Sequence, residues 1–259
     1  MYFKTWTIAR RCVQLAMIAL LASPLTGLSI FSGNLAAADL LGLPLADPLA
    51  FLQVLLGSRV LVWSYLVSAL AVVGFYFLLG GRSFCGWVCP VGLFTELADR
   101  LRKRLGTGQT TLPLRFNRWA LALVLVVAAL TSVPLFEVLS PIGMVGRAIA
   151  FGSLLPLLLV SVIVLCEVVV AQRVWCRSLC PLGGLYALVG RFSPLRVGFR
   201  PERCTHCNDC LQVCPVQEVL LPSLEKGALQ VTAGDCTRCM ACQEVCPAKA
   251  LTINAGYHS

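Results

Sequence analysis

The sequence has little charge and very little histidine. Charged residues make up 13% of the 259 residues and hydrophobic residues 58%, whereas a soluble domain usually carries about 25% charged residues. We therefore expect much of the surface not to face water. The two histidines, His206 and His258, both lie outside the long apolar runs, which excludes a haem held between apolar helices by two histidines.

The usual nucleotide-binding motifs are also missing. The chain has no dinucleotide fingerprint, no P-loop and no Cys-x-x-Cys-His sequence for covalent haem. We therefore expect electrons to be exchanged directly with iron–sulfur centres or thiols. The net charge of +9 comes from basic residues beside apolar runs, so nucleic acid is not an expected partner.

Four uncharged apolar runs, at residues 12–33, 60–81, 119–136 and 148–166, are the largest feature that is present. Each is long enough to cross the ~30 Å hydrocarbon core of a bilayer. Basic residues gather before the first run, between the second and third, and after the fourth, which places both termini in the cytoplasm. We expect residues 1–200 to form a four-helix transmembrane domain in the lipid bilayer of a bacterial inner membrane.

Residues 82–92 are repeated at residues 173–183, and each copy follows one pair of apolar runs. Both copies contain Cys-x-x-x-Cys-Pro, with Cys85 and Cys89 in the first and Cys176 and Cys180 in the second. In a helix, a separation of four residues places both sulfurs on one face. Four thiolates would suit a third iron–sulfur cluster. The alternatives are redox thiols or metal passage, and packing cysteines at helix ends.

Two cysteine runs near the C-terminus have the bacterial ferredoxin spacing C-x2-C-x2-C-x3-C-P, in which the fourth cysteine binds the other cluster. The spacing therefore predicts two interleaved [4Fe–4S] sites. The first would use Cys204, Cys207, Cys210 and Cys246, and the second Cys236, Cys239, Cys242 and Cys214. A zinc site normally needs four ligands rather than two interleaved runs. We expect residues 201–259 to form a small cytoplasmic α+β domain with strands at 228–232 and 250–254.

A few polar residues lie in or near the apolar runs. Asn34, Asp47 and Gln53 follow the first run; they would either line a quinol head-group site or act as turn and capping residues. Glu167 lies beside Arg173 at the end of the fourth run, where we expect a partly solvated ion pair. An arginine next to each Cys-x-x-x-Cys-Pro pair would favour the thiolate.

The chain resembles the NapH/MauN-type membrane ferredoxins. The resemblance is carried by Gly33-Asn34, by Asp47-Pro48-Leu49 with Gln53, by both Cys-x-x-x-Cys-Pro copies with Trp87 and Trp175, and by the double ferredoxin run. It implies four helices with both termini inside. It also implies that electrons come from quinol and leave towards a periplasmic iron–sulfur or cytochrome partner.

Three functions follow as hypotheses. The first is an electron-transfer membrane subunit of a quinol dehydrogenase serving a periplasmic reductase of the nitrate type, rather than a stand-alone catalyst. The second is an assembly or maturation factor that supplies electrons or handles metal for a periplasmic redox enzyme, as in methylamine utilisation. The third is an anchor that docks soluble redox proteins.

Overall fold

The computed structural model of the protein describes residues 5–23, 31–34, 37–40, 43–106, 111–152 and 154–255. The chain forms two compact units, each built from separate segments of the sequence. Unit one comprises Met1–Val13, Phe75–Val88 and Tyr186–Ser259, and unit two comprises Gln14–Gly74 and Cys89–Leu185. The division into domains at residue 200 stays a prediction, because the units follow packing rather than chain order.

Unit two is largely helical. Its helices are α2 (Pro48–Ser58), α5 (Pro90–Leu105), α6 (Arg115–Thr131), α7 (Leu135–Leu139), α8 (Pro141–Phe151), α9 (Leu154–Val169) and the π-helical turn η2 (Trp175–Leu179). Helix α2 packs against α6, and α9 packs against both α5 and α8. Three short antiparallel strands, β1 (Phe31–Asn34), β2 (Ala37–Leu40) and β3 (Leu43–Ala46), complete it.

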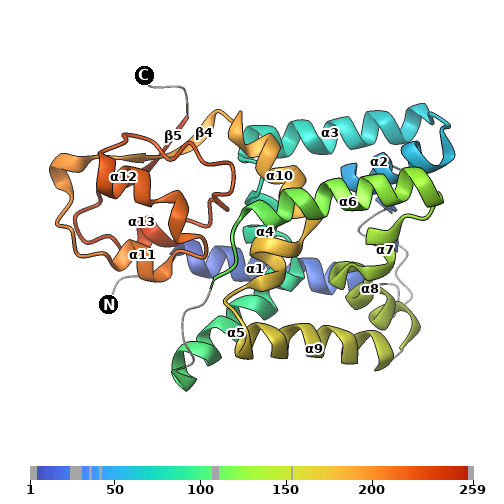
Figure 1. The fold of residues 1–259 in the computed structure, drawn as a ribbon, viewed down its shortest axis with the longest axis horizontal. Helices are drawn as coiled ribbons and strands as arrows, with labels where there is room; N and C mark the ends of the chain where they lie inside the picture. Colours follow the sequence, from blue (N-terminus) through green and yellow to red (C-terminus); the bar gives the residue numbers. More distant parts are fainter. Residues whose placement is uncertain are drawn as a thin grey trace. The chain divides into compact units, whose positions relative to one another are not determined.

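Unit one contains the two ferredoxin-type cysteine runs. It holds α4 (Ser83–Trp87), β4 (Leu195–Phe199), η3 (Pro201–Arg203), α11 (Asp209–Val213), η4 (Gln217–Val219), α12 (Leu221–Lys226), α13 (Ala241–Val245) and β5 (Leu251–Ala255). It also holds the first turns of α1 (Thr5–Ala22) and the ends of α3 (Trp63–Leu79) and α10 (Pro181–Arg191). Helices α11 and α13 pack together, and β4 pairs with β5 in an antiparallel ribbon (Figure 1).

The strand prediction is half right. β5 matches the strand expected at 250–254 within one residue. The strand expected at 228–232 is wrong, because in that stretch only Gln230 forms a bridge, to Gly198. The partner of β5 is β4, from Leu195 to Phe199. Its residues lie in the stretch that we assigned to the other domain, so pairing between distant parts of the chain decided which strand forms.

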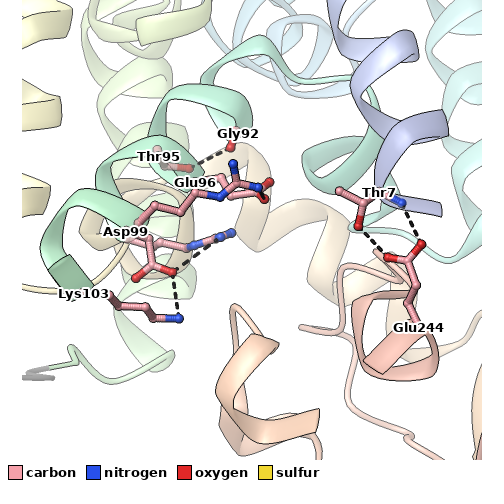
Figure 2. A network of polar contacts seen from close by, with 9 residues as sticks. Thr7, Gly92, Thr95, Glu96, Asp99, Lys103 and Glu244 are labelled. Carbon is pink, nitrogen blue, oxygen red and sulfur yellow. Dashed lines mark hydrogen bonds and ion pairs between the residues drawn. The ribbon is translucent and has the colours of Figure 1, made fainter. Parts of the chain in front are cut away.

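The first turn of α1 is attached to α13. Glu244 accepts hydrogen bonds from the backbone N–H groups of Trp6 at 2.7 Å and Thr7 at 3.2 Å, and from Thr7 Oγ1 at 2.5 Å (Figure 2). A carboxylate at a helix N-terminus satisfies free N–H groups and favours the helix dipole. Trp6 also packs edge-on against Trp87, with ring centroids 6.1 Å apart. The start of the chain is therefore part of the cysteine-rich unit.

The prediction of four transmembrane helices is wrong. Helices do form near each apolar run, but α1 has 18 residues, α3 and α6 have 17 each, and α9 has 16. At 1.5 Å per residue these helices are about 24–27 Å long, shorter than the ~30 Å hydrocarbon core. In the described part of the chain, no helix combines the length and apolarity needed to cross a bilayer. This overturns both the four-span fold class and the multi-pass inner-membrane location.

Local backbone features explain why these helices are short. Helix α3 is followed by Gly80 and Gly81, both at positive φ. Helix α6 ends at Ser132, which is left-handed with φ 58° and whose N–H bonds to Ala128 O. Gly81 cannot be replaced freely, since an added Cβ would lie 2.3 Å from the carbonyl oxygen of Tyr186. A left-handed residue of this kind ends a helix, so the apolar runs continue beyond the helices that they form.

Candidate metal centre

The first predicted cysteine set lies around one small pocket. Cys204, Cys207, Cys210 and Cys246 all line it, together with the apolar side chains of Phe199, Leu224 and Leu251. Burial raises the pKa of the Cys210 thiol, and the neighbouring thiols of Cys246, Cys207 and Cys204 raise it further. Cys246 belongs to the second run in sequence but lies with the first run in space, as the interleaved assignment requires.

The second predicted set lies close to cysteines of the first run. Burial raises the pKa of the Cys242 thiol well above its ordinary value, and Cys239, Cys236, Cys214 and Cys210 add to the effect in that order. Cys214 ends α11, and Cys242 lies within α13. Because α11 and α13 pack together, the two cysteine runs lie side by side.

These donor sets fit [4Fe–4S] clusters. In a cubane each of the four thiolates binds a different iron, so the sulfurs do not need to converge on one ion. Within the described ranges, no three or more His, Cys, Asp or Glu side chains are grouped closely enough to hold a single metal ion. The assignment of each cysteine to a cluster stays a prediction.

The two cysteine loops have the same backbone path. His206 and Asn208 in the first loop, and Arg238 and Met240 in the second, all have positive φ between 46° and 61°. Asn208 and Met240 each precede a short helix, α11 or α13. These left-handed residues turn the chain between successive cysteines, so the repeated spacing in sequence produces a repeated local structure.

The two cysteine loops differ in solvent exposure, and the sequence did not predict this difference. In the first loop residues 205–208 are exposed, including Cys207, whereas in the second Arg238, Cys239 and Met240 are buried. Helix α4 covers part of the second loop. Trp87 Nε1 donates to Arg238 O at 3.0 Å, and a Cβ on Gly86 would lie 2.9 Å from Thr237 O. The second loop therefore packs on the helix that carries Cys85.

A buried ion pair joins the same two segments. Arg82, which precedes α4, lies 2.9 Å from Asp235, and the side chains are 2% and 7% exposed. Asp235 directly precedes Cys236. The sequence signal for this contact is a difference between the repeat copies. Gly86 and Trp87 stand where the second copy has Arg177 and Ser178, and the missing side chain of Gly86 lets the first copy approach Thr237.

The Cys-x-x-x-Cys-Pro pairs do not lie on continuous helices. Cys85 is in α4, but Cys89 is extended at the start of α5; Cys176 is in η2, but Cys180 is extended at its end. The expected placement of both sulfurs on one helix face is therefore wrong. Burial raises the pKa of the Cys85 thiol, and the opposing effect of Arg82 is smaller. A third cluster at these cysteines stays a prediction.

The ion pair expected for Glu167 is also different in the structure. Glu167 is 2% exposed, and its carboxylate accepts a hydrogen bond from Trp175 N at 3.2 Å, at the start of η2. Burial raises the pKa of Glu167 to about 7. Arg173 instead lies 3.9 Å from Asp99, which also pairs with Lys103 at 3.5 Å (Figure 2). Glu167 therefore holds the turn that carries Cys176.

The three residues considered for quinol have different roles. The side chain of Asn34 lies outside the described part of the structure. Asp47 caps α2 by accepting from Leu49 N, and Gln53 is buried between Leu49 O and Phe136 N. The contacts of Asp47 and Gln53 thus match the capping alternative; a quinol site at these residues stays a prediction.

Replacing Asp47 by Asn is expected to change the pH dependence of stability. Burial, and then the charge of Glu137, raise the pKa of Asp47 from 3.8 to about 7. A raised carboxyl pKa means that the group costs stability as pH rises from about 4 to 7, and that the full cost remains above 7. Asparagine keeps the cap without this cost. In thermal unfolding, the melting temperature of the variant relative to the wild type should be at least about 2 °C higher at pH 8 than at pH 5, roughly the effect of 1 kcal/mol. The same difference between variant and wild type at both pH values would contradict the prediction.

Comparison with known families agrees with the cysteine pattern. A family described as "4Fe-4S binding domain" matches twice, at residues 61–108 and 153–200. A family described as "4Fe-4S dicluster domain" matches residues 196–247. The first covers both Cys-x-x-x-Cys-Pro copies, and the second covers both ferredoxin runs.

Curated relatives match over most of the chain. A methylamine utilization ferredoxin-type protein MauN of Paracoccus denitrificans is 38% identical over 235 residues, covering 89% of this chain and 83% of the relative. MauN of Methylorubrum extorquens is 36% identical, covering 90% and 82%. The ferredoxin-type protein NapH of Escherichia coli is 34% identical, covering 89% and 82%. No solved structure matches.

Proposed function

Because this chain belongs to the family of NapH- and MauN-type ferredoxin proteins, we propose that it carries electrons from quinol, through two [4Fe–4S] clusters in unit one, to a redox partner protein. That the chain is an iron–sulfur electron-transfer protein of the ferredoxin type is established by its family. The observation that supports the two-cluster proposal is that Cys246 of the second run lines one pocket with Cys204, Cys207 and Cys210 of the first.

The proposed chemistry balances without a further reactant. A bound [4Fe–4S] cluster stores one electron at a time. Oxidation of one quinol to quinone releases two electrons and two protons, so two clusters would hold the electrons of one quinol. The cysteine thiolates hold the iron, and the apolar wall of Phe199, Leu224 and Leu251 limits water at the first set. The acceptor would be an iron–sulfur or cytochrome subunit that takes the electrons one at a time.

The experiment begins with anaerobically purified protein and a count of iron and acid-labile sulfide. We expect about 8 iron atoms per chain for two cubanes, and about 12 if the Cys-x-x-x-Cys-Pro pairs hold a third. A count near 12 should fall to about 8 when Cys85 and Cys176 are replaced by Ser. A chain that binds no iron would remove the basis for the proposal.

The donor is tested separately. Reduced quinol is added to the loaded protein, and cluster reduction is followed by electron paramagnetic resonance, with dithionite as the positive control. Reduction by dithionite but never by quinol would contradict the quinol donor and leave the electron-transfer role intact. The quinol site at Asn34, Asp47 and Gln53 stays a prediction; in the structure Asp47 and Gln53 bond to backbone groups.

A second candidate is a maturation role in methylamine utilisation. It is favoured by the similarity to the MauN proteins, two of which are 36% and 38% identical to this chain. Deleting the gene should then leave the partner enzyme inactive even with artificial electron donors. If only quinol-dependent activity is lost, the electron-carrier proposal is supported instead.

A further inference from the structure

Arg238 occupies an unusual place for an arginine. It lies between Cys236 and Cys239 in the second cysteine loop, and it is 3% exposed. Its guanidinium donates to the carbonyl oxygens of Leu195 at 2.7 Å, Gly190 at 3.2 Å and Cys236 at 3.3 Å, and also to Gly80 O. These bonds give each guanidinium nitrogen at least one partner, but carbonyl oxygens do not neutralise its charge.

No carboxylate pairs with Arg238 among the described residues. The nearby Arg82 has such a partner, Asp235, at 2.9 Å. A charge that is buried without a counter-ion is strongly unfavourable. Arg238 lies between Cys236 and Cys239 of the second set and bonds to Cys236 O, so thiolates that bind a cluster there would supply negative charge beside it. The counter-charge is therefore found in the cluster site itself.

The equivalent position of the first loop lacks this charge. His206 stands where the second loop has Arg238, with the same left-handed backbone. His206 is exposed, as are Cys207 and Asn208 beside it. The two loops thus share a backbone path but differ in one buried cation, which makes His206 a matched control for Arg238.

We propose that Arg238 is the counter-charge of the second cluster and gives that cluster the higher reduction potential of the two. The inference rests on the two-cluster function proposed above. Reduction adds one negative charge to a cluster, and a buried cation beside it stabilises that charge. Water at the exposed first loop also favours reduction. However, a charge acts about fourfold more strongly at the effective dielectric of ~20 inside a protein than in bulk water. We therefore expect the buried cation to raise the potential of the second cluster more than water raises that of the first.

The consequence is a direction for the electron. When one electron passes from the first cluster to the second, one cluster is oxidised and the other reduced, with no bond or proton changed. Arg238 makes this transfer favourable, so the electron is held beside α4, the helix that carries Cys85. The exposed first loop is then the place where electrons enter the chain.

The order of the two potentials is tested in the full chain with Arg238 in place. Cys207→Ser removes a ligand of the first cluster, and Cys239→Ser a ligand of the second. Redox titration followed by electron paramagnetic resonance should leave the higher of the two wild-type midpoints in Cys207→Ser and the lower in Cys239→Ser. The reverse order, or equal midpoints, would overturn the proposal.

The role of Arg238 is tested by three variants. Arg238→Gln should shift only the higher midpoint, to a more negative value, while Arg238→Lys keeps the charge and most of the wild-type midpoint. His206→Gln, the matched control, should change neither midpoint. If Arg238→Gln retains full iron and both midpoints are unchanged, the proposal is wrong. If Arg238→Gln fails to bind iron, the order of midpoints in Cys207→Ser and Cys239→Ser decides whether the proposal holds.

Failure of this inference can be told apart from failure of the proposed function. The wild-type iron count tests the two-cluster function by itself. A count near 8 with reversed midpoints would overturn only the role of Arg238. A count near 4 would show a single cluster and overturn both.

Discussion

Replacing Cys246 by Ser is expected to destroy the cluster of the first run, although Cys246 belongs to the second. Cys246 lines the same pocket as Cys204, Cys207 and Cys210, so its loss leaves that set with three thiolates. Iron should fall from about 8 to about 4 atoms per chain. The remaining electron paramagnetic resonance signal should match that of Cys207→Ser and differ from that of Cys239→Ser.

The reciprocal variant and a neutral control complete the test. Cys214→Ser should leave the same signal as Cys239→Ser, because the ferredoxin spacing assigns Cys214 to the second cluster. Cys12→Ser changes an exposed cysteine outside all four pairs and runs, and it should keep the full iron content. If Cys246→Ser instead leaves the signal of Cys239→Ser, each run holds its own cluster and the interleaved assignment is wrong.

Replacing Arg82 by Ala is expected to destabilise the protein by about 3–5 kcal/mol, because it removes the arginine from a buried ion pair with Asp235. The pair is 2.9 Å long and its side chains are 2% and 7% exposed, so solvent does not replace the lost arginine. Chemical denaturation of the iron-loaded protein measures the change. Because Asp235 precedes Cys236, we also expect the second cluster to be lost before the first during unfolding.

An exposed ion pair provides the matched control. Arg100 lies 3.2 Å from Glu96, but its side chain is 58% exposed, and such a pair contributes at most about 1 kcal/mol. Arg100→Ala should therefore cost much less than Arg82→Ala. The double variant Arg82→Ala with Asp235→Ala should recover part of the loss, since it leaves no unpaired charge. Equal costs for Arg82→Ala and Arg100→Ala would show that the buried pair does not stabilise unit one.

The cysteine sites were predictable because their information is local. The spacing of Cys204 to Cys214 and of Cys236 to Cys246 sets which sulfurs can reach a common cluster. In the structure Cys246 of the second run lines one pocket with Cys204, Cys207 and Cys210 of the first; the assignment of each cysteine to a cluster stays a prediction. The strand β5 was predictable for a similar reason, since short apolar runs with β-branched residues favour strands.

The failed predictions depended on contacts or helix ends that composition does not reveal. The apolar runs were read as whole helices, but left-handed residues such as Gly81 and Ser132 end the helices before the runs end. The partner of β5 was misplaced because Leu195–Phe199 is distant in sequence from Leu251–Ala255. Glu167 was paired with its neighbour Arg173, whereas the fold gives Arg173 to Asp99.

The sequence by itself determined the family, the ferredoxin-type cysteine sets and the repeated Cys-x-x-x-Cys-Pro copies, because each is written in short-range spacing. Only the tertiary structure decided that the two cysteine loops differ, with Arg238 buried in one and His206 exposed in the other. The physical reason is that burial and charge compensation depend on which segments pack together. Arg82 and Trp87 reach the second loop across about 150 residues of sequence, as the separations of 153 and 151 residues in their hydrogen bonds show.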